Sequence, residues 1–167
     1  MINKINKLSR SEFVKVFANI FEKTEWIAEE LYNQVPFNNF EELSLKMLNI
    51  FDTASKEKKL KILNAHPDLA NKTKIGLLTS DSLKEQNSAG LDKCTKEEFD
   101  EFKKLNFSYK KFGFPFILAV KGKNKFEILQ NFRKRVSSEP EIEFKEAIKQ
   151  VKKIASLRLE DLNNKGI

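Results

Sequence analysis

Apolar residues recur along most of the chain at spacings of three and four positions, the period of a helix with one buried face. The first clear run consists of Phe13, Val16, Phe17, Ile20 and Phe21. Ser9 lies before this run, and Glu12 follows Ser9 by three positions. This Ser-x-x-Glu pattern is typical of a capping box, in which each side chain bonds the other residue's backbone. The pattern predicts a helix that begins directly after Ser9.

The same spacing predicts further helices. Their expected ranges are 24–32, 39–50, 54–63, 95–111, 125–136 and 141–162. Thr24 is expected to cap the first of these, and Thr95 with Glu98 forms a second capping box before the fourth. Only one stretch, FGFPFILAV at 112–120, resembles a strand. The sequence therefore predicts an all-α fold of about eight helices.

Length and composition agree with this fold class. The chain has 167 residues, of which 40% are apolar and 33% charged, the balance of a globular protein. It has only 5 glycines and 4 prolines, fewer than turn-rich β folds need. Because no repeat or linker-like segment divides the sequence, we expect one domain over residues 1–167.

The charge of the chain bears on its partners. The net charge is +7, but only four of the 31 basic residues are arginines. Nucleic-acid readers rely on arginine for bidentate contacts with bases and phosphates. Lysines spread along the chain indicate a solvated surface, so no nucleic-acid partner is expected.

The sequence contains a single cysteine, Cys94, and a single histidine, His66. An internal disulfide is impossible and a transition-metal site is not expected, since no set of His and Cys ligands exists. The N-terminal MINKINKLSRSEF lacks the apolar run of a secretory leader, and no stretch reaches membrane-spanning length. We therefore expect a cytoplasmic protein with no membrane partner.

The single histidine precedes a proline in the stretch NAHPDLA. The ring of Pro67 disfavours the α conformation for His66, and proline itself suits the first position of a helix. We therefore expect His66 at the start of a short helix, with a stiffened backbone that holds the imidazole in place.

A second candidate stretch is SLKEQNSAGL, residues 82–91. Ser82 and Glu85 match a capping box, which would give Glu85 a structural role. The adjacent polar pair Glu85 and Gln86, followed by small residues, also suits a binding site at the start of a helix. The residues alone favour the structural interpretation.

Two further places interrupt the plain helical pattern. In FGFPFI, Gly113 and Pro115 stand among aromatic residues, which indicates either a buried connector or a rigid loop that presents backbone groups to a ligand. Arg158 falls on the apolar face of the last predicted helix, close to the direction of Ala147 and Val151. A guanidinium on this face needs an anionic or carbonyl partner, which could be a protein carboxylate or a ligand.

At these motifs the sequence resembles the family of 2-oxo-4-hydroxy-4-carboxy-5-ureidoimidazoline (OHCU) decarboxylases, enzymes of urate breakdown. The resemblance rests on four stretches in the same order along the chain: AHPDLA, LTSDSLKEQNSAGLD, FKKLNFSYKKFGFPFILAV and EFKEAIKQVKKIASLRLEDL. The N-terminal region FVKVFANIFEKTEWIAEELYNQVPF also fits the family. Each motif alone is weak, but four motifs in register are specific.

The resemblance implies an all-helical fold and decarboxylation of OHCU to (S)-allantoin without a cofactor. It places the catalytic histidine at His66 and the catalytic glutamate at Glu85. The ligand-contacting positions that it implies are Pro67, Ser82, Gln86, Arg158 and the backbone around Phe116 and Ile117. These residues are expected to meet around one small pocket, in a protein that the resemblance suggests is a homodimer.

Two other functions stay open from the sequence. A family member could act on a related ureido or imidazoline acid. The motifs constrain the reaction more strongly than they constrain the residues at the rim of the substrate site. From another class, a basic all-α module could bind nucleic acid or an acidic protein through its lysines.

Overall fold

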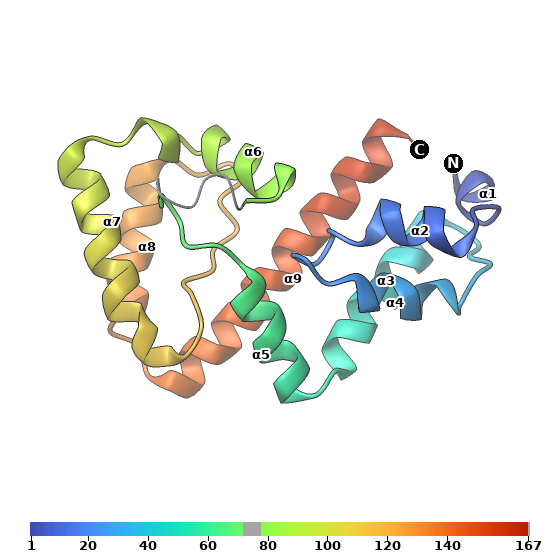
Figure 1. Cartoon of the computed structure of the whole chain (residues 1–167), viewed down its shortest axis with the longest axis horizontal. Helices are drawn as coiled ribbons and strands as arrows, with labels where there is room; N and C mark the ends of the chain where they lie inside the picture. Colours follow the sequence, from blue (N-terminus) through green and yellow to red (C-terminus); the bar gives the residue numbers. More distant parts are fainter. Residues whose placement is uncertain (72–77, 167) are drawn as a thin grey trace. The chain divides into compact units, whose positions relative to one another are not determined.

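The computed structural model describes residues 1–71 and 78–166, and within them the regular structure is entirely helical (Figure 1). The α-helices are α1 (Ile2–Ile5), α2 (Arg10–Phe17), α3 (Glu25–Tyr32), α4 (Phe40–Thr53), α5 (Lys56–Ala65), α6 (Ser80–Ser88), α7 (Lys96–Tyr109), α8 (Lys125–Arg135) and α9 (Pro140–Lys165). Two short 3-10 helices follow α6 and α7, namely η2 (Leu91–Lys93) and η3 (Lys110–Phe112). This architecture confirms the predicted all-α fold.

The chain is organised in two compact units. The first comprises Met1–Ala65 with Lys152–Ile167, and the second comprises His66–Val151. Helix α9 contributes its first half to the second unit and its remainder to the first. Most of the predicted site residues belong to the second unit.

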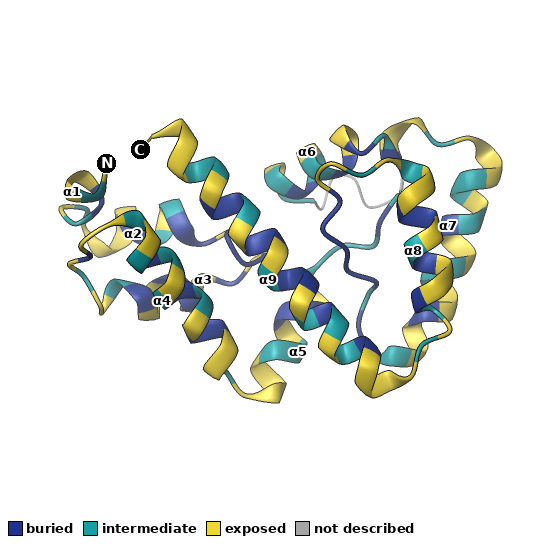
Figure 2. Cartoon of the chain, turned by 180° about the vertical axis from the view of Figure 1, so that it is seen from behind, coloured by how far each residue is buried: buried dark blue, intermediate teal, exposed yellow. Residues whose placement is uncertain are grey.

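In the first unit, α3 packs against both α2 and α4, and the buried faces of these helices form the core (Figure 2). The core is rich in phenylalanines in ring contact: the centroids of the tilted rings of Phe13 and Phe17 are 4.5 Å apart, and those of the stacked rings of Phe21 and Phe51 are 4.9 Å apart. Ser9 and Glu12 form the predicted capping box at the start of α2. The apolar spacing thus predicted both this helix and the face that it buries.

In the second unit, α7 and α8 lie side by side (Figure 1). Their shared core is aromatic and is centred on Tyr109, whose ring lies edge-on to those of Phe116 and Phe132. The rings of Phe116 and Phe132 stack with their centroids 3.9 Å apart. Aromatic contacts of this kind fix the segment that carries Phe116 against α7 and α8.

The segment that resembled a strand, 112–120, forms neither strand nor α-helix: η3 covers its first residue and an irregular connector follows. Gly113 adopts a left-handed conformation with φ of +81°, and Pro115 has no N–H to donate. Residues 116–120 are nevertheless buried. The apolar run therefore reflects a buried connector, one of the two interpretations that the sequence allowed.

One predicted helix cap is wrong. Thr24 precedes α3, but its hydroxyl donates to the carbonyl oxygen of Glu22 at 2.8 Å and caps no N–H of the helix. The sequence could not reveal this choice, since a threonine hydroxyl can bond several nearby backbone groups.

The start of α8 provides a test of capping. Asn124 accepts hydrogen bonds from the backbone N–H groups of Phe126 and Glu127, both at 3.0 Å. We expect Asn124→Ala to destabilise the protein by about 1 kcal/mol, which lowers the melting temperature by roughly 2–4 °C for a chain of this size. Gln130→Ala, at an exposed position of the same helix, is the control and should melt as the wild type does. Equal melting temperatures for all three proteins would contradict a stabilising cap.

Candidate active site

His66 follows the last residue of α5, Ala65, and lies in a turn that is half-buried. No helix begins at Pro67, so the short helix expected there is wrong. The restriction that Pro67 places on His66 ends α5 as expected. Ala70, however, adopts a left-handed conformation with φ of +53°, which turns the chain away from a helical path.

Two side chains from the second unit anchor the turn that carries His66. The backbone N–H of Ala70 donates to Gln86 Oε1 at 3.0 Å, and Asn106 Nδ2 donates to the carbonyl oxygen of Leu69 at 3.1 Å. Gln86 lies on α6 and Asn106 on α7. The backbone downstream of the imidazole is therefore fixed to two different helices, which holds it in one conformation.

Helix α6 begins three residues earlier than the Ser82–Glu85 pattern suggests. Thr79 is its N-cap, and its hydroxyl accepts a hydrogen bond from the backbone N–H of Ser82 at 3.3 Å. Ser82 is therefore inside the helix, and the capping-box interpretation of Ser82 and Glu85 is wrong. Glu85 is therefore not a capping residue at the helix start, so the capping explanation for its presence falls away.

Ser82, Glu85 and Gln86 occupy positions i, i+3 and i+4 of α6, which places them on one face of this helix. Ser82 and Gln86 are buried, while Glu85 is half-buried. Since Gln86 bonds the backbone at Ala70, this face is the one that contacts the turn after His66. The structure thus brings the polar face of α6 to the segment that carries the imidazole.

Gln86 carries a buried donor that no described residue accepts from. Its side chain is 7% exposed, and Nε2 has no hydrogen-bond partner among the described residues, although Oε1 is bonded. A buried polar group without a partner costs about 1–3 kcal/mol. Such a group is therefore expected mainly where a ligand or an ordered water completes it.

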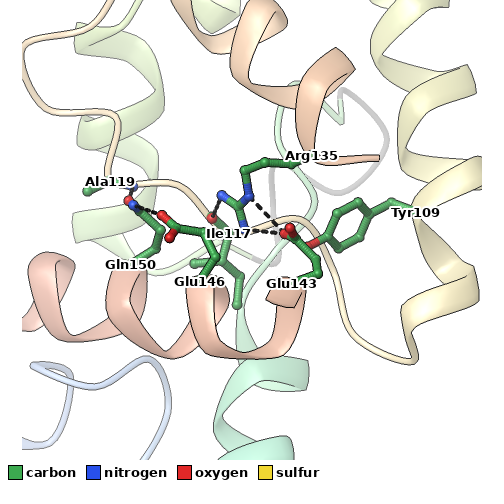
Figure 3. A network of polar contacts seen from close by, with 7 residues as sticks. All are labelled: Tyr109, Ile117, Ala119, Arg135, Glu143, Glu146 and Gln150. Carbon is green, nitrogen blue, oxygen red and sulfur yellow. Dashed lines mark hydrogen bonds and ion pairs between the residues drawn. The ribbon is translucent and has the colours of Figure 1, made fainter. Parts of the chain in front are cut away.

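Phe116 and Ile117 are both fully buried in the connector between η3 and α8. The carbonyl oxygen of Ile117 accepts a hydrogen bond from Arg135 Nη1 at 2.6 Å (Figure 3). Arg135 was not among the predicted site residues. The scarcity of arginine in a lysine-rich chain was the only sequence signal that could have singled it out.

Arg158 belongs to the first unit, where its guanidinium is paired within the protein. Its Nη1 lies 3.0 Å from Glu22 Oε2 and donates to the carbonyl oxygen of Asn19 at 2.9 Å. The side chains of both ion-pair partners are buried. The partner of Arg158 thus includes a protein carboxylate, one of the two possibilities that the sequence left open. A contact between Arg158 and substrate, or its approach to His66, stays a prediction.

Within residues 1–71 and 78–166, no group of three or more His, Cys, Asp or Glu side chains could hold a metal ion. No helix of this described part of the chain combines the length and apolar character needed to cross a membrane.

The fold and these motifs define an all-helical domain with a polar helix face beside a histidine turn. The family model described as OHCU decarboxylase matches residues 6–160, across both units. An OHCU decarboxylase of Haloferax volcanii is 38% identical over 159 residues, covering 95% of this chain and 93% of that protein. The corresponding mouse enzyme is 37% identical, covering 95% and 90%. The chain belongs to the OHCU decarboxylase family.

A longer relative and two solved structures show the same similarity. The uric acid degradation bifunctional protein of Bacillus sp. (strain TB-90) is 39% identical over 166 residues. The match covers 99% of this chain but only 32% of that relative, about a third of its length. A crystal structure of (S)-allantoin synthase superposes with a TM-score of 0.77 at 30% identity, covering 96% of this chain and 53% of that one. An OHCU decarboxylase crystallised in the presence of (S)-allantoin superposes with a TM-score of 0.72 at 22% identity, covering 87% and 96% of the two chains, and shows the common fold.

The buried pair of Arg158 and Glu22 yields a stability prediction. Glu22→Gln removes the charge that compensates the buried guanidinium, which should destabilise the protein by roughly 3–5 kcal/mol in urea unfolding. The control is Lys152→Ala, which removes an ion pair between Lys152 and Asp52 on the surface of the same unit. This exposed pair should contribute less than about 1 kcal/mol. Similar losses for the two variants would show that burial of the Arg158 pair has no energetic consequence.

Proposed function

We propose that this chain catalyses the decarboxylation of OHCU to (S)-allantoin in urate degradation, and is thus a carboxy-lyase. Membership of the family over nearly the whole chain supports this function. The observation that links the proposal to a particular atom is the buried Nε2 of Gln86, which has no hydrogen-bond partner in the described part of the chain. This side chain lies on the helix face that contacts the turn after His66. A carbonyl or ureido oxygen of the substrate is a suitable acceptor for this donor.

The chemistry of OHCU explains why few protein groups suffice. When the bond to the carboxylate breaks and CO2 leaves, the electron pair enters the conjugated C=N and C=O groups of the ring. The ring is therefore its own electron sink, and the proposal includes catalysis without an organic cofactor. A proton delivered to the ring carbon from one face then sets the single (S) configuration of allantoin.

In this proposal His66 acts as the acid–base at the C4 hydroxyl or carboxylate of the substrate, and Glu85 orients the imidazole. Gln86 and Ser82, on the same face of α6, hold polar groups of the ring and the ureido chain. Pro67 stiffens the turn beside the imidazole, and the backbone near Phe116 and Ile117 fixes the plane of the ring. These roles depend on holding one conformer of the substrate away from bulk water.

The proposal also covers the location of the enzyme and its partners. A cytoplasmic location agrees with a single cysteine, Cys94, and a surface dominated by lysine. Assembly as a homodimer and the lack of a nucleic-acid partner are included on the basis of the family resemblance and the scarcity of arginine.

The role of His66 is tested by His66→Ala. Loss of a general acid–base should lower the turnover number by about 10²–10⁴-fold, while the circular dichroism and melting temperature stay close to those of the wild type. Urate is converted to OHCU by the two preceding enzymes, and the appearance of optically active allantoin is followed by circular dichroism. Asn64→Ala, at an exposed position two residues earlier, is the control. Near-full activity of a folded His66→Ala protein would refute the assignment.

The role of Glu85 is tested by Glu85→Gln, which keeps the size of the side chain and removes its charge. If Glu85 orients the imidazole, kcat should fall roughly tenfold to a hundredfold with little change in KM. Lys84→Gln changes the exposed neighbouring residue of the same helix and should leave both constants unchanged. Wild-type kcat in the Glu85→Gln protein would rule out this orienting role.

A further inference from the structure

The connector at residues 116–120 is buried, and the described residues contain no strand that could pair its backbone polar groups. Side chains supply two of the missing partners. Arg135 Nη1 donates to the carbonyl oxygen of Ile117 at 2.6 Å, and the N–H of Ala119 donates to Gln150 Oε1 at 3.0 Å (Figure 3). Since a buried backbone group without a partner is costly, these bonds fix the path of the connector.

Two glutamates of α9 hold the anchoring side chains of Arg135 and Gln150 in place. Glu143 Oε1 accepts hydrogen bonds from Arg135 Nε at 2.8 Å and Arg135 Nη2 at 2.5 Å, and also from the hydroxyl of Tyr109. Gln150 Nε2 donates to Glu146 Oε1 at 2.7 Å. Neither anchor is free to change rotamer without breaking a second interaction.

Tyr109 completes the network as a permanent donor. Burial, and then the hydrogen bond to the Glu143 carboxylate, raise the pKa of the Tyr109 hydroxyl above its usual value. The hydroxyl therefore stays protonated at any ordinary pH and keeps donating to Glu143.

The geometry at position 135 requires arginine. One edge of its guanidinium donates to Glu143, and a further N–H donates to the carbonyl oxygen of Ile117. The guanidinium also lies over the ring of Phe116, with Cζ 4.5 Å from the ring centroid. A lysine ammonium has no planar fork and cannot make these three contacts together. Since buried ion pairs often add little net stability compared with apolar residues of similar volume, this pair is better explained by the conformation that it imposes.

Between the two held groups lies Leu118. It is buried. The backbone is held on both sides of this residue, at Ile117 and at Ala119. The connector therefore has one fixed path, which a segment that presents main-chain groups to a ligand requires.

We infer that Arg135 and Gln150 are positioning residues, which set the backbone of the connector in the conformation that contacts substrate. Glu143 and Tyr109 act through Arg135, since they hold its guanidinium. The inference rests on the proposed function, because it assumes that the connector contacts OHCU.

The test compares Arg135→Lys with Arg133→Lys. Arg133 lies on the same helix and forms a surface ion pair with Glu101 through Nε, 2.6 Å from Oε1, so it is a matched arginine outside the connector. In the urate-coupled assay, Arg135→Lys should raise KM for OHCU by about tenfold or more, with a smaller change in kcat. Arg133→Lys should keep the KM of the wild type. A purely structural role would lower the amount of folded enzyme and leave KM of the folded fraction unaltered.

A second variant tests the same inference in case Arg135→Lys does not fold. Gln150→Met removes the acceptor for Ala119 without changing any charge, and it should also raise KM. Amide hydrogen exchange at Leu118 and Ala119 should be faster in both variants than in Arg133→Lys, whether or not OHCU is the substrate. Wild-type KM together with wild-type exchange would overturn the inference, and so would variants whose only defect is lost folded protein. A wild-type chain that does not consume OHCU would instead contradict the proposed function, while the exchange data would still report on positioning.

Discussion

The structure of the second unit depends on one constraint: a buried backbone group must have a hydrogen-bond partner. In an all-helical fold, most such groups are satisfied inside helices, and a buried irregular segment is the exception. The connector at 116–120 is such a segment, and side chains from α8 and α9 take the place of a strand. The elements around it must therefore present long polar side chains inward, which explains why Arg135 and Gln150 are buried.

The same constraint links the histidine turn to α6. The turn after His66 leaves the helix of α5 and needs new partners for its backbone, and Gln86 and Asn106 provide them. Gln86 meets this need with its oxygen only, because an amide has a donor and an acceptor that point in different directions. Its Nε2 then has no acceptor among the described residues, which is unfavourable unless a ligand accepts the hydrogen bond. In the proposed function, one side chain thereby combines support of the turn with recognition of the substrate.

The sequence predicted most of what depends on local spacing. Helix faces follow from apolar periodicity, and the capping boxes at Ser9 and Thr95 are formed as expected. The failures at Thr24 and Ser82 both arise because a short polar side chain can bond several nearby backbone groups. The Thr24 hydroxyl bonds the carbonyl of Glu22 instead of a helix N–H, and Thr79 caps α6 in place of Ser82.

Partners far apart in the sequence could not be predicted from spacing. Glu22 pairs with Arg158 across more than a hundred residues, and no local pattern marks it. The roles of Arg135 and Glu143 are hidden for the same reason, although the two are close in sequence, because the carbonyl that Arg135 binds lies in another element. For His66 and Glu85 the family resemblance is the source of the assignment, and their catalytic roles stay a prediction.

The need to pair buried backbone groups also explains where this lysine-rich chain uses buried arginine. Lysine serves a solvated surface well, because its ammonium is a compact charge that water surrounds easily. The two buried arginines each combine a carboxylate with a backbone carbonyl: Arg135 binds Glu143 and Ile117, and Arg158 binds Glu22 and Asn19. Only a planar group with five N–H donors meets both demands at once. Two of the four arginines therefore mark places where the interior of the protein binds its own backbone, whereas Arg10 and Arg133 lie exposed.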